Sequence, residues 1–348
     1  MGGGVRGIII LIMRIKLSHK FEDIISVDNL LEAWQEFILG KRNKKDVQEF
    51  NSHLMDNILL LNCELSNYTY KHGGYQEFNI CDPKSRIIHK ASVRDRLLHR
   101  AVYRILYPFF DRTFISDSFS CRDEKGTHRA IDRFRGLAHS VSKNNTKTCW
   151  VLKGDIKKFF YSIDQHILLE ILQKYIPDKD IAGLLKEIIT SFQYIKPGFG
   201  LPLGNLTSQL FANIYMNEFD QFVKHKLKVR HYIRYADDFV ILSGHENYLK
   251  GKVLLIADFL KDELNLALHP GKVFIKTLCS GVDFLGWVNF PDHRVIRGKT
   301  KSRMFKRVGN NDLETLNSYI GMLSHGNTEK IKDKVFKSYT GNEGNIVG

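Results

Sequence analysis

Two adjacent carboxylates, Asp237 and Asp238, occupy the tight turn of a segment that is apolar on either side. The flanking runs, Tyr232-Ile233 and 239–242, predict the two strands of a hairpin. Desolvating adjacent anions is costly unless a cation compensates them, so a metal ion is the natural counter-charge. Because aspartate is also common in ordinary turns, this pair by itself leaves a turn without chemistry open.

A third acid, Asp155, strengthens the metal interpretation. It follows the apolar strand 150–152 and precedes an apolar helix start at Phe159-Phe160. Two strand-end carboxylate sites held side by side in one sheet can bind a pair of hard cations roughly 4 Å apart. One ion lowers the pKa of an attacking 3′-hydroxyl and the other stabilises a pyrophosphate leaving group, which is most of what phosphoryl transfer needs. We therefore expect two Mg²⁺ ions, for which Mn²⁺ could substitute, at Asp155, Ile156, Asp237 and Asp238, with the three aspartates as catalytic residues.

The charge of the chain points to a polyanionic partner. Its 348 residues carry 52 Lys and Arg against 38 Asp and Glu, a formal net charge of +14. Basic side chains that neutralise phosphates release condensed counterions, so this excess favours nucleic acid over charge kept only for solubility. A membrane is a much weaker explanation, because the apolar run 8–13 is far shorter than the roughly 20 residues of a spanning helix. Either Met13 is the natural start or this run is an inward-facing N-terminal segment.

Cysteine usage indicates a reducing compartment. The chain has five cysteines, an odd number without C-x-x-C spacing, which argues against a disulfide framework or a zinc site. We expect reduced thiols in a cytoplasmic protein of bacterial, archaeal or phage origin. With 43% hydrophobic residues the chain can bury a substantial core.

Apolar spacing predicts a mixture of helices and strands. Helical spacing covers 20–65 (two helices joined by the basic turn 40–45), 94–110, 165–175, 178–192, 205–228 and 299 onwards, where Leu313, Leu316, Ile320 and Leu323 form the apolar stripe. Strands are expected at 149–152, twice in 231–243 and once at 282–290, with a hairpin around Gly73-Gly74 within 68–89. Asp178 is placed to cap the helix that follows it. This order indicates an α+β fold in which helices cover one side of an antiparallel sheet.

Four ordered segments resemble the motifs of reverse transcriptases. Residues 151–160 (VLKGDIKKFF), 200–209 (GLPLGNLTSQ) and 235–238 (YADD) are similar to palm motifs A, B and C, and 284–287 (FLGW) is similar to the primer grip. The resemblance runs from about residue 82 to about residue 327 and implies an RNA-directed DNA polymerase. It also implies a right-hand polymerase fold, with N-terminal helices and fingers in 1–148, a palm in 149–290 and a helical thumb in 291–348. The helical insertion 165–198 would be contiguous with fingers and palm.

The same resemblance implies a gate at the nucleotide sugar. Phe160, five residues after Asp155, stands where the family carries an aromatic ring that excludes a ribose 2′-hydroxyl. Plain core packing is the alternative for Phe160, and it is the favoured interpretation for neighbouring Phe159.

Basic residues would contact the triphosphate. Lys84 and Arg86 resemble fingers residues that close over it, Arg86 as a bidentate partner, although Lys84 fits a solvated hairpin face nearly as well. Lys272 resembles the motif D lysine proposed to protonate the leaving pyrophosphate, and an exposed turn lysine is an equal alternative. The expected nucleotide-binding set is Lys84, Arg86, Phe159, Phe160, Leu203, Gly204, Gln209 and Lys272.

Motif B points to a subgroup. Many retroviral and group II intron enzymes carry a glutamine after the motif B proline, whereas this chain has Leu203. The segment 201–209, with 117–122 (DSFSCR) and 125–130 (KGTHRA), closely resembles the reverse transcriptases of diversity-generating retroelements. Those enzymes copy a template RNA with frequent errors at adenines and work with a small basic accessory protein. An aliphatic side chain at Leu203 removes a positional restraint, so a mispair loses less relative to a correct pair.

Alternatives stay open at this level. A retron-type, CRISPR-associated or phage-defence reverse transcriptase shares the palm motifs. A non-catalytic RNA-binding module would be a different class of protein, but it gives no reason to keep three mutually repelling acids. The region after the thumb leaves no room for a maturase, nuclease, RNase H or protease domain, so we expect target nicking and integration to come from other proteins.

A run of cations begins the C-terminal helical region. We expect it to follow a nucleic-acid backbone, and a merely solvated basic face is the alternative. Its members are Arg297, Lys299, Lys301, Arg303, Lys306 and Arg307, with Arg294 just before them.

Overall fold

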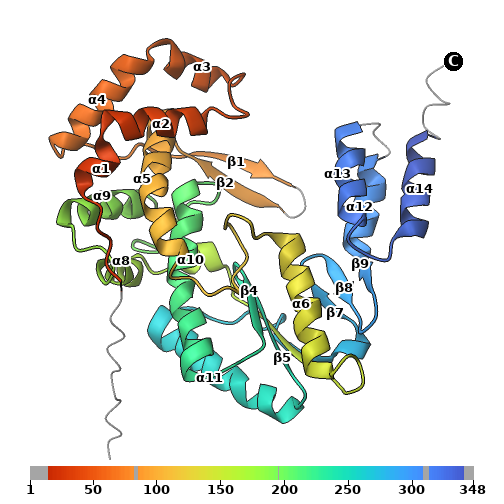
Figure 1. Ribbon diagram of the computed structural model, residues 1–348. Helices are drawn as coiled ribbons and strands as arrows, with labels where there is room; N and C mark the ends of the chain where they lie inside the picture. The colour runs from red at the N-terminus through yellow and green to blue at the C-terminus, as the bar shows by residue number, and fades with distance from the viewer. Residues whose placement is uncertain (1–14, 82–84, 195, 309–312, 341–348) are drawn as a thin grey trace, which may run out of the picture. The chain divides into compact units, whose positions relative to one another are not determined.

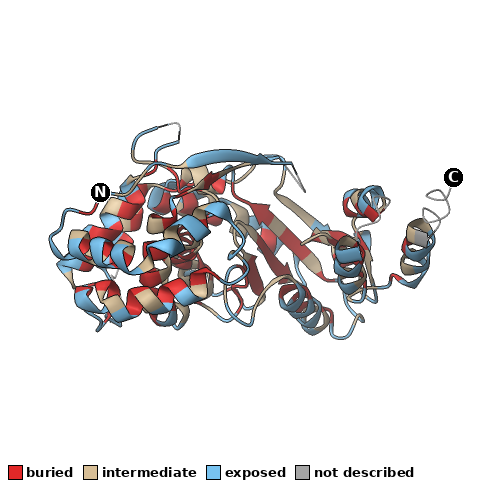
Figure 2. Cartoon of the chain, turned by 90° about the horizontal axis from the view of Figure 1, so that it is seen from above, coloured by how far each residue is buried: buried red, intermediate tan, exposed pale blue. Residues whose placement is uncertain are grey.

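The computed structural model describes residues 15–81, 85–194, 196–308 and 313–340 (Figure 1). The chain divides into two units, each built from separate stretches. Unit 1 combines Met1–Phe114 with Phe160–Tyr215, and unit 2 combines Ile115–Phe159 with Met216–Gly348. Inner helix faces in both units and the strands of the unit 2 sheets carry most of the buried residues, drawn red in Figure 2. The α+β class expected from the sequence is confirmed.

Four short helices open unit 1. They are α1 (Phe21–Ile25), α2 (Val27–Phe37), α3 (Lys45–Ser52) and α4 (Leu54–Ser66), so the prediction of two helices over 20–65 is wrong. The chain leaves helical geometry at Ser26 and at His53. At the first break the Ser26 hydroxyl accepts a hydrogen bond from the Asn29 amide at 3.2 Å and caps α2. Apolar spacing continues across both breaks and therefore did not reveal them.

The predicted hairpin is present, but its turn is not at Gly73-Gly74. β1 (Gln76–Ile80) pairs antiparallel with β2 (Arg86–Lys90), from Gln76 opposite Lys90 to Ile80 opposite Arg86. Gly73 instead allows the Asp95 carboxylate to approach the backbone closely. Its amide donates to Asp95 Oδ2 at 3.1 Å, and an added Cβ would lie 2.9 Å from that oxygen.

Further helices complete unit 1, and the helices predicted over 94–110, 165–175, 178–192 and 205–228 are confirmed. Asp178 accepts hydrogen bonds from the Asp180 and Ile181 amides and so caps α9, as expected. The helices are α5 (Val93–Asp111), α7 (Phe159–Ser162), α8 (Gln165–Gln173), α9 (Lys179–Thr190) and the first part of α10 (Leu206–Gln221), which continues as the π-helix η1 (Phe222–Lys226).

A four-stranded antiparallel sheet forms the centre of unit 2, in the order β4-β5-β3-β6. β3 and β5 pair along their full length, from Trp150 opposite Ser243 to Asp155 opposite Asp238. The strand 274–277 and the helices 127–142 and 246–264 were not expected from the sequence. The elements are β3 (Trp150–Asp155), β4 (Tyr232–Tyr235), β5 (Asp238–Ser243) and β6 (Phe274–Thr277), with helices α6 (Thr127–Ser142) and α11 (Glu246–Leu264).

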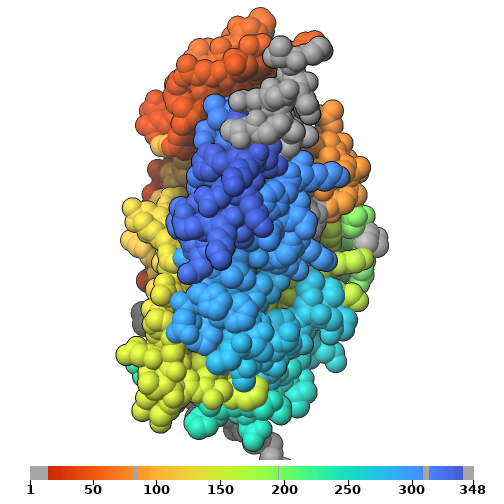
Figure 3. Space-filling view, turned by 90° about the vertical axis from the view of Figure 1, so that its right-hand side faces the viewer, coloured from red at the N-terminus to blue at the C-terminus, as the bar shows by residue number. Residues whose placement is uncertain are grey.

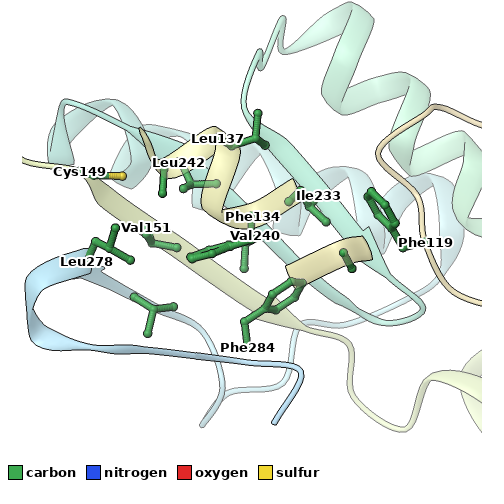
Figure 4. Close-up of a cluster of buried hydrophobic side chains, with 13 residues drawn as sticks. Phe119, Phe134, Leu137, Cys149, Val151, Ile233, Val240, Leu242, Leu278 and Phe284 are labelled. Carbon is green, nitrogen blue, oxygen red and sulfur yellow. The ribbon is translucent and has the colours of Figure 1, made fainter. Parts of the chain in front are cut away.

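Helices cover both faces of this sheet, not one as expected. On one face Phe134 of α6 joins Val151 and Val240 in a buried cluster (Figure 4). On the other face the rings of Phe239 in β5 and Phe219 in α10 meet edge to face at 5.2 Å. Successive strand residues alternate between these two cores, as the pleat requires.

A second antiparallel sheet of three strands follows in unit 2. The single strand expected over 282–290 is a hairpin, because the chain reverses at Leu285 and Gly286, whose φ values are 52° and 87°. Positive φ at both central residues belongs to tight hairpin turns, but leucine rarely adopts it, so composition gave no sign of the turn. The strands are β7 (Val282–Phe284), β8 (Trp287–Asn289) and β9 (Arg294–Ile296).

Three helices, α12 (Gly298–Val308), α13 (Leu313–Leu323) and α14 (Glu329–Thr340), end the described chain. Leu316 and Leu323 of the predicted stripe are buried in a cluster with Trp287, whereas Leu313 is 58% exposed. No helix in the described ranges is long and apolar enough to cross a membrane. The five cysteines are free thiols.

Candidate active site

The three predicted catalytic carboxylates meet at one end of the unit 2 sheet. Asp155 is the last residue of β3, Asp238 is the first residue of β5, and the two are direct partners in the antiparallel register. Asp237 lies in the turn between β4 and β5, where Ala236 adopts a left-handed φ of 54°. The pairing of two segments far apart in sequence thus brings together acids that the sequence only suggested were neighbours.

Glycine is required beside Asp155. A Cβ added to Gly154 would collide with the ring of Phe239, its direct partner across the β3–β5 ladder. The ring therefore packs over bare backbone, and the two strands can pair up to the carboxylates. The sequence analysis missed this role, although a glycine inside an apolar strand is the signal for it.

The electrostatics of the site reflect crowded anions. Burial raises the pKa of Asp237 to about 6, and repulsion from Asp238 and Asp155 adds to the effect. Burial also raises the pKa of Asp238, which Lys153 opposes. Asp238 Oδ1 is buried and has no hydrogen-bond partner. A buried carboxylate oxygen without a hydrogen bond is the kind of atom that a cation would satisfy.

Two lysines supply positive charge at this end of the sheet. Lys272 Nζ lies 2.8 Å from Asp155 Oδ1, and Lys153 Nζ lies 3.6 Å from Asp238 Oδ1. Lys272 was predicted for the nucleotide site, whereas Lys153 was missed. Its position two residues before Asp155 on the same strand could have identified it, because residues i and i+2 share a face.

The turn that carries Lys272 is fastened to the end of β3. The His269 amide donates to the Asp155 carbonyl at 2.7 Å, and the Lys157 amide donates to the Ala267 carbonyl at 2.9 Å. Ile156, buried between them, forms a β-bridge with Leu268. The backbone thus holds Lys272 beside Asp155 even though its side chain is partly exposed.

The donor set fits hard divalent cations, because carboxylate oxygens are ligands that Mg²⁺ prefers. Among the described residues, however, no three His, Cys, Asp or Glu side chains are already arranged around a common point. Metal binding would therefore need rotation of the carboxylates and displacement of Lys272 from Asp155.

The predicted residues of motif B lie in unit 1, beside β2. The His89 amide donates to the Leu203 carbonyl at 2.9 Å, and Asn205 Nδ2 donates to the His89 carbonyl at 2.8 Å. Gly204 has a φ of 100°, and an added Cβ would lie 2.6 Å from Ile88 Cγ2. Only glycine fits this turn, which joins Leu203 and Gly204 to the strand that begins with Arg86.

The remaining nucleotide-site predictions have mixed surroundings. Arg86 is exposed and Gln209 is half-buried. Phe159 is core, with 3% of its surface exposed, as the sequence suggested, whereas Phe160 is only partly buried. Lys84 lies outside the described residues.

The predicted basic run extends from Arg297, just before α12, to Arg307 in the last turn of that helix. Lys299, Lys301 and Lys306 are exposed, whereas Met304 of the same helix is buried. Arg297, just before the helix, instead pairs with Asp283 at 2.8 Å. The run continues with half-buried Arg303 and exposed Arg307, both of which have other contacts, while Arg294 pairs with Asp132 at 2.9 Å.

Comparison with known proteins places the chain in a family. Residues 71–288 match the family described as "Reverse transcriptase (RNA-dependent DNA polymerase)". Protein YkfC of Escherichia coli (strain K12) is 26% identical over 248 residues, covering 60% of this chain and 63% of that protein. The group II intron-encoded protein LtrA of Lactococcus lactis subsp. cremoris is 25% identical over 299 residues, covering 66% of this chain and 47% of that protein.

Among solved structures, a chain of the partial Cas6-RT-Cas1--Cas2 complex matches with a TM-score of 0.40 and 22% identity, covering 71% of this chain and 43% of that chain. The chain therefore spans less than two thirds of the length of each of these proteins. The family match covers well over half of the chain and includes all three carboxylates. The chain belongs to the reverse transcriptase family.

Proposed function

We propose that this protein is an RNA-directed DNA polymerase and that the three carboxylates of unit 2 form its catalytic centre. The observation that carries the proposal is the β3–β5 register, which sets Asp155 opposite Asp238 at the strand end next to Asp237. Membership of the reverse transcriptase family supports it. The buried Asp238 Oδ1, which accepts no hydrogen bond, supports a cation at this point.

Asp155, Asp237 and Asp238, with the backbone of Ile156, would hold two Mg²⁺ ions, or Mn²⁺ in their place. When bound, one ion would lower the pKa of the attacking 3′-hydroxyl, and the other would stabilise the negative charge of the leaving pyrophosphate. Lys272 breaks its ion pair with Asp155 and moves to the pyrophosphate. Its ammonium group donates a proton to this leaving group. Lys153 stays beside Asp238 and limits the repulsion among the acids.

Residues of unit 1 select and hold the nucleotide in this proposal. Phe160 excludes a ribose 2′-hydroxyl, because its side chain is only partly buried in the core. Arg86 pairs with the triphosphate, and its exposure leaves its guanidinium available. The hydrogen bond from His89 to the Leu203 carbonyl holds the motif B turn against the same hairpin.

The fingers would comprise 1–148, the palm 149–290 and the thumb 291–348. Within the family we propose the diversity-generating retroelement type, on the strength of Leu203 and the motif B string around it. The partners are then a template RNA, dNTPs and a small basic accessory protein. The test is Leu203→Gln, which should lower misincorporation opposite template adenines several-fold while leaving errors opposite the other bases unchanged. An identical error spectrum in both proteins would remove Leu203 from fidelity control.

Primer extension on an RNA template with dNTPs and Mg²⁺ tests the catalytic centre. Asp237→Ala should lower the extension rate at least about 100-fold, equivalent to roughly 2.7 kcal/mol of transition-state stabilisation. Asp258→Ala, which removes an exposed carboxylate from α11, is the matched control and should extend normally. If wild type binds RNA but does not extend a primer, the protein is a binding module. Near-normal extension by Asp237→Ala would show that the centre lies elsewhere.

A further inference from the structure

A basic hollow lies at the end of the unit 2 sheet opposite the carboxylates. Its volume is about 790 Å³, within the range of roughly 300–1,000 Å³ that ligand pockets have. Three loops meet there: the loop after α6, the reversal before β4, and the link from β5 to α11. The basic residues that line it are Lys143, Lys147, Lys228, Arg230, His231 and His245.

The walls of the hollow are held by backbone geometry. After α6, Lys143, Asn144 and Asn145 all adopt positive φ, between 50° and 66°, and the Lys147 amide donates back to the Ser142 carbonyl at 2.8 Å. Asn145 Nδ2 bonds to Asp292 Oδ1 at 2.9 Å, which fastens this loop from behind. Lys143 and Lys147 therefore project from an anchored loop. Figure 3 shows the yellow region that ends α6 beside the turquoise start of α11 near the bottom of the view.

Positive charge in the hollow is not neutralised by the protein. Lys143, Lys147, Lys228 and Arg230 are exposed, and none forms an ion pair within the described ranges. None of the residues that line the hollow is an acid. Glu246, which begins α11, is already paired with Lys250 at 2.8 Å. Burial and then the charges of Arg230 and Lys224 lower the pKa of His231, as expected in a positive field.

We propose that the basic hollow binds an unpaired stretch of RNA at a site separate from the catalytic centre. Four cations without protein partners suit successive phosphates, and Tyr248 in the wall, 40% exposed, offers a ring on which an unstacked base can lie. Lys252 Nζ lies over that ring, 4.9 Å from its centroid, and adds a further positive charge beside it. Duplex DNA keeps its bases stacked and cannot use the ring.

The two sites cannot be served by the same nucleotide. β3 runs from Trp150 at the hollow to Asp155 at the carboxylates, roughly 17 Å at about 3.3 Å per residue. RNA in the hollow is therefore a part of the strand away from the templating base. The inference extends the proposed function, and its test measures binding, so a failure of catalysis and a failure of this site are seen separately.

The test compares the full chain with Lys147→Gln/Lys228→Gln, using an unstructured oligoribonucleotide and binding measured over a range of KCl concentrations. Each lost phosphate contact on a single strand removes about 0.7 from the magnitude of the salt slope, so the double variant should lose about 1.4. At 0.1 M KCl this corresponds to roughly 25-fold weaker binding, taking the contacts to contribute nothing near 1 M. Lys186→Gln/Lys261→Gln, with the same charge loss at exposed helix positions, should bind as wild type.

Variants of Tyr248 provide a second test of RNA binding that does not change the charge of the protein. Tyr248→Ala should weaken RNA binding roughly 5- to 150-fold without changing the salt slope, while Tyr248→Phe keeps the ring and should bind as wild type. Extension of a short primer–template at saturation should be unchanged in all these variants. An unaltered salt slope in Lys147→Gln/Lys228→Gln would overturn the proposal. An acidic protein would then be the better candidate to bind in the hollow. Equal losses for RNA and for a DNA duplex would overturn the assignment to unpaired RNA.

Discussion

Arg234 lies at the end of β4, beside the turn that carries Asp237, and replacing it tests how that turn is held. The guanidinium is fully buried and donates to both oxygens of Asp220, at 2.8 and 2.7 Å. It also donates to the Ala236 carbonyl at 3.1 Å and to the Ser118 hydroxyl at 3.0 Å. Arg234→Met removes these bonds and leaves the Asp220 carboxylate buried without a counter-charge. Breaking a buried pair in this way should lower the free energy of unfolding by about 3–5 kcal/mol.

Most of that loss comes from the charge that is left behind. Adding Asp220→Asn neutralises it, while the amide oxygen can still accept the hydrogen bond that the Tyr232 hydroxyl now gives to Asp220 at 2.7 Å. We expect the double variant to recover at least about 2 kcal/mol. Extension activity should not recover with stability, because the Ala236 carbonyl in the turn has still lost its donor.

Urea unfolding followed by tryptophan fluorescence measures the four corners of this cycle, since Trp150 lies in the same sheet. The exposed pair Lys250–Glu246 is the control, and its cycle should give only roughly 0.3–0.5 kcal/mol. A coupling energy between Arg234 and Asp220 below about 1 kcal/mol would refute the reasoning. So would full extension activity of Arg234→Met at saturating substrate.

Three further changes test other parts of the structure. Phe160→Val should admit ribonucleotides by opening space beside the sugar, and unchanged discrimination with measurable dNTP incorporation would place the gate elsewhere. Gly204→Ala should destabilise the protein by about 1–3 kcal/mol, because the φ of Gly204 is 100° and an added Cβ would press on Ile88. As the control, Gly136→Ala at an exposed position of α6 should stabilise the protein by about 0.5–1 kcal/mol. Similar denaturation midpoints for the two variants would contradict this prediction. Burial lowers the pKa of His99 from 6.5 to about 3, so the unfolded chain binds a proton below pH 6.5 that the folded chain does not. The free energy of unfolding should therefore fall, by up to about 1.4 kcal/mol per pH unit, as the pH drops from 6.5 towards 3. Urea titrations at pH 6 and 5 should show a smaller dependence on pH for His99→Gln than for the wild type. The same pH dependence in both proteins would disprove the prediction.

Local features of this chain could be predicted from its sequence. The three acids, the strands beside them and the Asp178 cap follow from alternation, turn preference and capping, each of which acts within a few residues. The same rules failed where a local signal had a long-range cause. Gly73 is a glycine because Asp95 approaches it, and Leu285 occupies a turn that its residue type does not suggest.

Only the tertiary structure decided how distant segments meet. The β3–β5 register sets Asp155 opposite Asp238, and a slip by one residue would turn one of these acids to the other face of the sheet. Register depends on which faces are buried, here by α6 on one side and α10 on the other. The same packing brings Lys272 to Asp155 and gathers three loops into the basic hollow. Such pairings join residues far apart in the chain, and their free energy comes from burial that no local sequence pattern records.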